Sequence, residues 1–232
     1  MKRLIIRFFP FLVVAINLTI WVCAYLLDKF TNLPEEVVWL PFAFIQGLVG
    51  FTFGVLVKRL HKGVYQDELT GLKNRRYFFS KLKEEIERVN RTKSPVSLVL
   101  IDVDDFKLVN DRYGHTEGDK VLISLAKILK QHSRTIDTPA RWGGEEFAII
   151  LPETTKNGAM VFAERLRGTV EQYKFSCKIT ISVGVATSNS HVGINDFTMM
   201  ADKALYQAKE QKNTIVAYEP RKPENTLKVM VG

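Results

Sequence analysis

Cysteine is scarce in this sequence, and no block of charge of one sign stands out. Cys23 and Cys177 are the two cysteines among 232 residues, which excludes a disulfide framework and a cysteine-ligated metal cluster. The formal net charge is +8, but no run of Lys and Arg dominates it. Charge alone therefore does not distinguish a nucleic acid, a membrane surface or an anionic small molecule as the partner. Internal repeats and low-complexity segments are also absent, so the length allows one good-sized domain and something smaller.

Hydrophobic residues make up 46% of the chain, and the excess lies in the first 60 residues. The apolar run 8–27 is long enough to cross the ~30 Å hydrocarbon core of a bilayer as a helix. A second run, 37–57, contains no charged residue, which favours two membrane spans over a cleavable signal peptide. The sequence therefore predicts a transmembrane helical hairpin over residues 1–60, followed by a short connector at 61–66.

The orientation of this predicted hairpin follows from the basic residues that flank it. They are Lys2, Arg3 and Arg7 before the first span, and Lys58, Arg59 and Lys62 after the second. The loop 28–36 between the spans has one lysine against three acidic residues. Because basic residues accumulate on the cytoplasmic side of membrane proteins, we expect both termini, and the domain that follows, in the cytoplasm.

From residue 67 to about 218, the apolar residues follow alternating helix and strand periods. Helical periodicity covers 76–91, 117–131, 156–170 and 196–211, and strand-like runs cover 96–103, 179–186 and 214–218. The run 96–103 is almost continuously apolar, as expected of a buried central strand. These elements predict an α/β domain with a mixed central sheet covered by helices, and a loose tail over 219–232.

Two short apolar runs, 138–142 and 147–151, are separated by a Gly-Gly pair and two acids. Because glycine tolerates the positive φ of tight turns, Gly143 and Gly144 predict a β-hairpin. Glu145 and Glu146 then lie beside backbone without side chains, where a phosphate-bearing ligand and a divalent cation would have room. An ordinary hairpin with a solvated acidic edge is the alternative.

Asp102 comes at the end of the predicted central strand. A carboxylate in that position is held rigidly, as a metal ligand should be, and it could meet Glu145 and Glu146 on an adjacent strand. Three carboxylates around one point repel one another unless cations bind them. This set therefore favours a site in which metal ions bridge the acids and the phosphates of a nucleoside triphosphate.

A second polar pair, Asn110 and Asp119, follows the central strand. Asn offers a donor and an acceptor, and Asp accepts from two donors, a combination that suits the edge of a guanine base. Turn and helix-cap roles are the common alternative for both residue types.

Several motifs occur in the order and spacing of one known family. They are DELTGLKNRR at 67–76, DVDDFKLVND at 102–111, GGEEF at 143–147 and YQAK at 206–209. On these motifs, residues 67–218 resemble the GGDEF family, the diguanylate cyclases. The resemblance implies a sheet related to the polymerase palm and the nucleotidyl cyclases. It also implies a homodimer that condenses two GTP into cyclic di-GMP and two pyrophosphates, here as a multi-pass protein of the bacterial inner membrane.

The resemblance also implies roles for single residues. Asp102 and Glu145, with the Val103 carbonyl, would bind Mg²⁺ or Mn²⁺, and Glu146 would be a further ligand or the base. The residues implied to bind GTP are Asn110, Asp119, Phe106, Lys107, Gly143, Gly144, Lys209 and Lys212. The implied inhibitory product site consists of Arg134, Asp137 and Arg165. One departure from the family pattern is the turn before Lys212, which is one residue shorter and lacks a glycine.

Two other functions are consistent with the same motifs. One is a catalytically silent receptor for GTP or cyclic di-GMP, against which the intact acids Asp102, Glu145 and Glu146 argue. The other is a cyclase that makes a mixed adenine–guanine dinucleotide, against which Asp119 argues, because a carboxylate repels the adenine N1 lone pair. We expect no nucleic-acid polymer as a partner.

Overall fold

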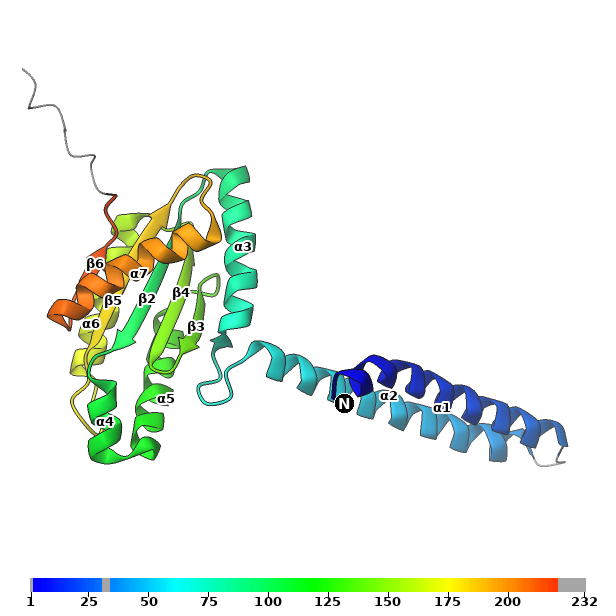
Figure 1. Ribbon diagram of the computed structural model, residues 1–232. Coiled ribbons are helices and arrows are strands. Elements are labelled where there is room, and N and C mark those ends of the chain that lie inside the picture. The colour runs from blue at the N-terminus through cyan, green and yellow to red at the C-terminus, as the bar shows by residue number, and fades with distance from the viewer. Residues whose placement is uncertain (1, 31–33, 221–232) are drawn as a thin grey trace, which may run out of the picture. The chain divides into compact units, whose positions relative to one another are not determined.

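The computed structural model describes residues 2–30 and 34–220, shown in Figure 1. The chain divides into two compact units, Met1–Lys62 and Gly63–Gly232. Most of the predicted loose tail, from residue 221 onward, lies outside the described residues.

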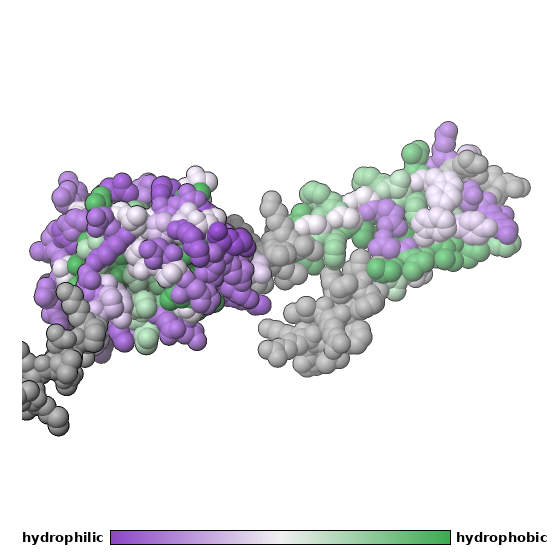
Figure 2. Space-filling view, turned by 90° about the horizontal axis from the view of Figure 1, so that it is seen from above, coloured by the Kyte–Doolittle hydropathy of each residue, from purple (hydrophilic) through white to green (hydrophobic). Residues whose placement is uncertain are grey.

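The first unit consists of one long helix, α1 (Lys2–Phe30), and most of a second, α2 (Glu35–Tyr65), which extends into the predicted connector. They contact each other through an edge-on pair of indole rings, Trp21 and Trp39, whose centroids lie 6.4 Å apart. Most of their described apolar side chains are exposed, and Figure 2 shows them on the outside of the helices. Apolar surface of this extent indicates contact with a membrane or a partner.

One helical stretch of the described residues, Glu36–Leu56, is long and apolar enough to cross a membrane. This helix meets the length and composition criteria for a membrane span, which buried core helices and signal sequences can also meet. No second stretch within the described part of the chain passes the same test. The prediction of two spans, 8–27 and 37–57, and of a multi-pass location is therefore not confirmed, although both stretches lie in helices.

The second unit is built on a six-stranded sheet with the order β1-β3-β4-β2-β5-β6. The strands are β1 (Lys73–Asn74), β2 (Val96–Val103), β3 (Thr138–Gly143), β4 (Glu146–Pro152), β5 (Ile181–Ser188) and β6 (Ile215–Ala217). The four central strands pair antiparallel, whereas β1 and β6 at the edges run parallel to their neighbours. The predicted mixed sheet is thus confirmed.

Helices cover both faces of this sheet. They are α3 (Arg75–Thr92), α4 (Phe106–Tyr113), α5 (His115–His132), α6 (Lys156–Gln172) and α7 (Ile194–Gln211). Helices α3 and α7 pack on one face, and α5 and α6 pack on the other. Alternate residues of β2 enter the two cores, Leu98 and Leu100 on the α7 face, Val99 and Ile101 on the opposite face. Burial on both sides explains why the sequence of β2 is continuously apolar.

Helix α7 lies unusually close to the sheet because β5 contains Gly184. A Cβ atom on Gly184 would stand 2.3 Å from the backbone nitrogen of Leu205 and 2.4 Å from the carbonyl oxygen of Ala201. No side chain fits in that gap without moving the helix. The glycine therefore sets the height of α7 above the sheet, and with it the position of residues near the end of the helix.

Two elements were not predicted. Helix α4 has eight residues, of which only Phe106 and Val109 are buried, too few to show a helical period. Strand β1 has only two residues and carries no pattern of its own.

Candidate active site

The ends of β2 and β4 place two carboxylates opposite each other. Asp102 and Glu146 are direct partners across the antiparallel ladder, so their side chains lie on the same face of the sheet, the one under α7. Asp102 is 4% exposed, and Glu146 is partly buried. The structure therefore brings together the strand-end acid and one acid of the signature.

The turn that carries Glu145 is held by Arg141. Gly144 and Glu145 form the turn between β3 and β4, Gly143 is the last residue of β3, and Gly144 has a φ of +31°. The Arg141 guanidinium donates two hydrogen bonds to the Gly144 carbonyl, at 3.0 Å from Nε and 2.7 Å from Nη2. The ladder also shifts between Arg141 and Gly143, an irregularity of the kind that re-aims side chains beside active sites.

The same guanidinium connects the turn to the first motif of the domain. Its Nη1 lies 3.1 Å from Oδ1 of Asp67, which also accepts hydrogen bonds from the backbone N–H and the hydroxyl of Thr70. Burial alone would raise the pKa of Asp67, but Thr70 and Arg141 together outweigh burial and hold the pKa below its usual value. Asp67 is thus a charged anchor for the hairpin turn.

Lys209 reaches this acidic cluster from α7. Its Nζ lies 2.8 Å from Oδ2 of Asp102. Burial raises the pKa of Asp102, and Glu145 and Asp104 add to the rise, while Lys209 opposes it. Burial and then Asp102 likewise raise the pKa of Glu146. The cluster holds more negative charge than one lysine neutralises, so a further cation would be stabilised there.

The donor set fits a hard divalent cation only in part. Within residues 2–30 and 34–220, no three His, Cys, Asp or Glu side chains stand close enough to form a complete metal site. Carboxylate oxygens are the ligands that Mg²⁺ and Mn²⁺ prefer. Asp102 and the two signature acids would therefore supply one side of a coordination shell, and the phosphates of a nucleotide would supply the other.

Asp104, two residues after Asp102, has a different role. It accepts hydrogen bonds from the hydroxyls of Ser182 at 2.6 Å and Thr180 at 2.7 Å, and from the backbone N–H of Asn213 at 2.9 Å. All three donors lie far away in sequence. Asp104 therefore ties the end of β2 to β5 and to the segment after α7, and it is not free to bind a ligand.

The shortened turn after α7 is left-handed at two residues, because Lys212 and Asn213 have φ values of +54° and +45°. The side chain of Asn213 holds it in place by bonding to Arg167 and Glu171 of α6. The Lys212 ammonium lies 2.7 and 2.8 Å from the two carboxylate oxygens of Asp105. The structure thus pairs Lys212 with an acid beside the site.

Asn110 and Asp119 lie inside neighbouring helices, α4 and α5. The N-caps of these helices are Asp105 and Gly114, so the alternative of turn and cap roles is wrong for both residues. A Cβ atom on Gly118 would stand 2.0 Å from Oδ1 of Asn110. The absence of a side chain at Gly118 is therefore what allows α5 to approach the Asn110 amide.

Phe106 and Lys107 begin α4. The Phe106 side chain is buried in the core, so only its backbone can approach a phosphate, whereas Lys107 is exposed. The first N–H groups of a helix have no acceptor within it and attract anions. These two residues therefore present backbone donors beside the end of β2.

The predicted inhibitory residues lie at the opposite end of the hairpin. The Asp137 side chain is 0% exposed. It accepts a hydrogen bond from the backbone N–H of Arg134 at 2.7 Å and another from its guanidinium at 2.9 Å. The guanidinium also donates to the Pro152 carbonyl and the Thr154 hydroxyl. Arg134 and Asp137 are thus together, and each already has partners.

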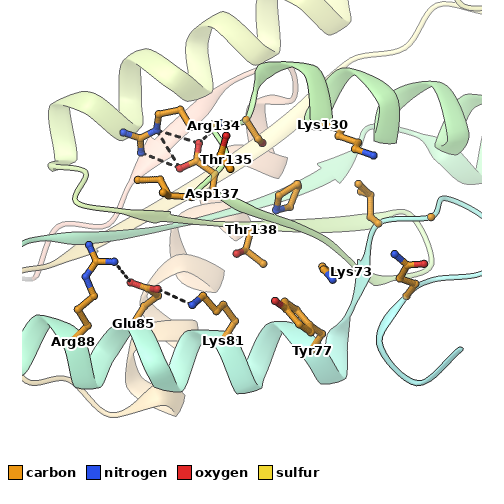
Figure 3. Close-up of a pocket in the computed structure, with 16 residues that line it drawn as sticks. Lys73, Tyr77, Lys81, Glu85, Arg88, Lys130, Arg134, Thr135, Asp137 and Thr138 are labelled. Atoms are coloured by element: carbon orange, nitrogen blue, oxygen red, sulfur yellow. Dashed lines mark hydrogen bonds and ion pairs between the residues drawn. The ribbon is translucent and has the colours of Figure 1, made fainter. Parts of the chain in front are cut away.

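A basic groove of about 570 Å³ opens beside this loop, between α3 and the start of β3. Figure 3 shows Lys81 and Arg88 of α3 bonded to Glu85, while the Arg134 guanidinium turns toward Asp137. Arg165 does not line the groove; its Nη2 donates to the His132 carbonyl at 3.3 Å. The structure therefore places the Arg165 guanidinium at the end of α5, next to the loop that carries Arg134.

Sequence reasoning missed Arg141 and Asp202. Arg141 lies two residues before Gly143. Its hydrogen bonds to the turn do not follow from any helix or strand period in the sequence. Asp202 of α7 contributes to the raised pKa of Glu146, after burial and Asp102. Its position seven residues before Lys209, on the same face of one helix, is a signal that could have revealed it.

Comparisons with known proteins agree with this geometry. The family model for the diguanylate cyclase GGDEF domain matches residues 64–214. Diguanylate cyclase A of Treponema denticola is 41% identical over 153 residues, which cover 62% of this chain and 41% of that protein. The response regulator PleD of Caulobacter vibrioides is 41% identical over 159 residues, 65% of this chain and 35% of its own. The chain thus spans less than half the length of these relatives.

Solved structures also share the fold. The coiled coil and GGDEF domain of DgcB from Caulobacter crescentus, in complex with c-di-GMP, has a TM-score of 0.72 at 26% identity. The matched region covers 78% of this chain and 98% of the DgcB chain. The active GGEEF domain of a diguanylate cyclase from Vibrio cholerae has a TM-score of 0.61 at 33% identity, covering 64% and 98%. The family model matches more than half of the residues of this chain, so the chain belongs to the diguanylate cyclase GGDEF family.

Proposed function

We propose that the second unit condenses two GTP molecules into cyclic di-GMP and releases two pyrophosphates, as a metal-dependent homodimer. The observation that carries this proposal is the facing pair of Asp102 and Glu146 beside a glycine turn, with a lysine as their neighbour. Such a pair suits an attack of a 3′-hydroxyl on an α-phosphorus, which needs neutralised phosphates and in-line placement. Family membership and the names of the relatives support the same reaction.

The acids would hold Mg²⁺ or Mn²⁺ through Asp102 and Glu145, together with the Val103 carbonyl. A divalent cation there supplies the charge that offsets the triphosphate in the transition state. Glu146 would complete the ligand set or accept the proton of the 3′-hydroxyl. Its raised pKa brings it nearer to neutral pH, which favours a role as a general base.

The remaining groups would bind the nucleotide. Lys209, Lys107 and the first N–H groups of α4 would bind the triphosphate, and the bare backbone of Gly143 and Gly144 would let it approach. Asn110 of α4 and Asp119 of α5 would read the guanine edge, since an amide and a carboxylate match its donors and acceptors.

The reaction needs a second protomer, because one domain presents one GTP and each nucleotide attacks the other. Deleting residues 1–60 should leave a soluble but weakly active domain, because tethering in a membrane raises the local concentration of protomers. Activity per molecule of the truncated protein should rise steeply with its concentration. Full activity at high dilution would show that the first unit does not promote dimerisation.

We place the protein in the bacterial inner membrane, with Glu36–Leu56 as one span, residues 8–27 as the second, and the catalytic unit in the cytoplasm. The apolar exterior of the helical unit supports this location. We also propose that the product binds at Arg134, Asp137 and Arg165 and inhibits the enzyme. The DgcB structure, in complex with c-di-GMP, supports product binding by a domain of this fold.

The decisive experiment incubates the detergent-solubilised full chain with GTP and Mg²⁺ and identifies the products by mass. Cyclic di-GMP and pyrophosphate are expected in a ratio of one to two. Binding of GTP or cyclic di-GMP without turnover, across a range of protein concentrations, would instead identify a silent receptor.

A further inference from the structure

Lys209 of α7 reaches the acidic cluster at the end of β2. Its ammonium bonds directly to Asp102 at 2.8 Å. Glu146 is the direct partner of Asp102 across the antiparallel ladder, and Glu145 precedes it in the hairpin turn. One monovalent cation thus occupies the acidic cluster into which the proposed function places a divalent one.

We propose that the Lys209 ammonium is a resident cation that pairs with the metal-binding acids in the nucleotide-free enzyme. When the metal ion enters, the lysine side chain moves from Asp102 to the triphosphate. This inference rests on the proposed function, because it assigns the order in which the same groups are used. It gives Lys209 a second role besides binding phosphate, which is to couple metal binding to nucleotide binding.

The two partners of this ion pair differ in their freedom to move. The Asp102 side chain is 6% exposed and belongs to a strand paired on both sides, whereas the Lys209 side chain is 48% exposed on a flexible stem. Helix α7 packs with its backbone directly on Gly184, and Lys209 reaches Asp102 from that position. Exchange at Asp102 therefore requires only that the lysine side chain rotates outward, a motion of exposed side chains that is fast.

Charge explains why the exchange should be coupled to the nucleotide. A divalent ion that enters without nucleotide must displace Lys209 and leave its ammonium beside another cation, which is unfavourable. With a triphosphate present, the displaced ammonium gains several phosphate oxygens as partners. Metal and nucleotide should therefore each raise the affinity of the other by the same factor.

Removing the resident cation should act in opposite directions on the two ligands. In Lys209→Met, Mn²⁺ affinity in the absence of nucleotide should rise about tenfold, within the usual range of coupling between ligands. Nucleotide affinity should fall, because the triphosphate loses its ammonium. A lysine whose only role is to bind phosphate would leave the nucleotide-free affinity for Mn²⁺ unchanged.

The test titrates the full chain in detergent with Mn²⁺ and follows free Mn²⁺ by electron paramagnetic resonance, with and without 3′-deoxy-GTP. This nucleotide lacks the attacking hydroxyl and cannot condense. Lys209→Arg keeps a cation at the position and should resemble the parent. Lys212→Met removes the same charge from a lysine that pairs with Asp105 instead, so its nucleotide-free affinity for Mn²⁺ should also match the parent.

The outcomes separate this inference from the proposed function. The exchange is supported if Lys209→Met binds Mn²⁺ more tightly than the parent without nucleotide while Lys209→Arg and Lys212→Met do not. In Lys209→Met, 3′-deoxy-GTP should also raise the affinity for Mn²⁺ less than it does in the parent. Equal nucleotide-free affinities in Lys209→Met and the parent overturn it, while Mn²⁺ binding by the parent with 3′-deoxy-GTP keeps the metal site. If the parent binds no Mn²⁺ under either condition, both the exchange and the metal-dependent function are overturned.

Discussion

The two ends of the β3–β4 hairpin differ in how the charge of a buried carboxylate is compensated. At the turn end, Asp102 and Glu146 face each other, and one lysine serves the whole acidic cluster. At the open end, Asp137 is completely buried but accepts hydrogen bonds from both the backbone and the guanidinium of Arg134. At the turn end, part of the negative charge has no positive partner. At the open end, the carboxylate of Asp137 is fully paired.

This contrast indicates what each end can bind. An under-neutralised cluster favours the arrival of a cation, because the ion relieves a repulsion that the fold maintains. A satisfied pair must exchange existing bonds for new ones before it can hold a ligand, so its net gain is smaller. We therefore expect the turn end to control turnover and the open end to adjust it.

Neutralising the turn end should have the largest effect. We expect Glu146→Gln to lower the rate by about a thousandfold or more, a loss of about 4 kcal/mol in the transition state, because the amide can neither bind the metal strongly nor take a proton. Initial rates of cyclic di-GMP formation at saturating GTP measure this loss.

Glu164→Gln is the matched control, since Glu164 is an exposed acid of α6 that pairs with Arg167. It should keep the parent rate. Turnover by Glu146→Gln close to that of the control would remove Glu146 from the mechanism.

At the open end, Arg134→Ala should weaken inhibition by cyclic di-GMP about ten- to a hundredfold. This corresponds to the loss of one charge-assisted contact, roughly 1.5–3 kcal/mol. Activity without product should stay near the parent level, because Arg134 lies at the far end of the hairpin from the acids. The measurement is the initial rate against added cyclic di-GMP.

Arg91→Ala, at an exposed position in the last turn of α3, provides the control for a lost surface charge. If it shifts the inhibition curve as much as Arg134→Ala does, the effect is a general electrostatic one. Identical curves for Arg134→Ala and the parent would reduce Arg134 and Asp137 to a structural ion pair.

The contrast also shows what the sequence could and could not predict. Strand 96–103 and the helix at 117–131 agree with β2 and α5, because their burial patterns are local in sequence. The bond from Arg141 to Asp67 joins residues 74 positions apart, so no local pattern contains it. The same is true of the donors to Asp104, and of Lys209, whose bond to Asp102 spans 107 positions. Motifs indicated which residues matter, but only the fold shows which charges are already satisfied.

Replacing the satisfied carboxylate should cost stability instead of activity. In Asp137→Asn, the amide turns donor atoms toward the N–H groups of Arg134, so we expect a loss of about 1–3 kcal/mol in the free energy of unfolding. Denaturant unfolding of the 63–232 unit measures it.

Asp105→Asn makes the same change in an exposed pair with Lys212 and should cost only about 0.2–1 kcal/mol. Equal losses in the two variants would contradict the distinction between the buried pair and the surface pair.

The smallest effect should be a pH dependence of stability specific to the turn end. Burial, followed by Asp102, raises the pKa of Glu146 in the folded state, so the folded metal-free domain binds this proton more tightly than the unfolded chain does. The contribution is therefore favourable below the unfolded pKa of a glutamate, about 4.3, and is lost as the pH rises through the folded value. Gln at position 146 does not titrate.

The free energy of unfolding of Glu146→Gln, minus that of the parent, should therefore increase between about pH 4 and pH 7 in the presence of a chelator. Taking the difference removes the acids that titrate in the opposite direction, such as Asp67, whose pKa is lowered by Thr70 and Arg141 against the effect of burial. Mn²⁺ together with 3′-deoxy-GTP should reverse the sign at neutral pH, because the parent then gains a ligand that the variant holds poorly. A difference that stays flat with pH in the chelated protein would mean that Glu146 is solvated, and that the two ends of the hairpin do not differ in the way their charges are compensated.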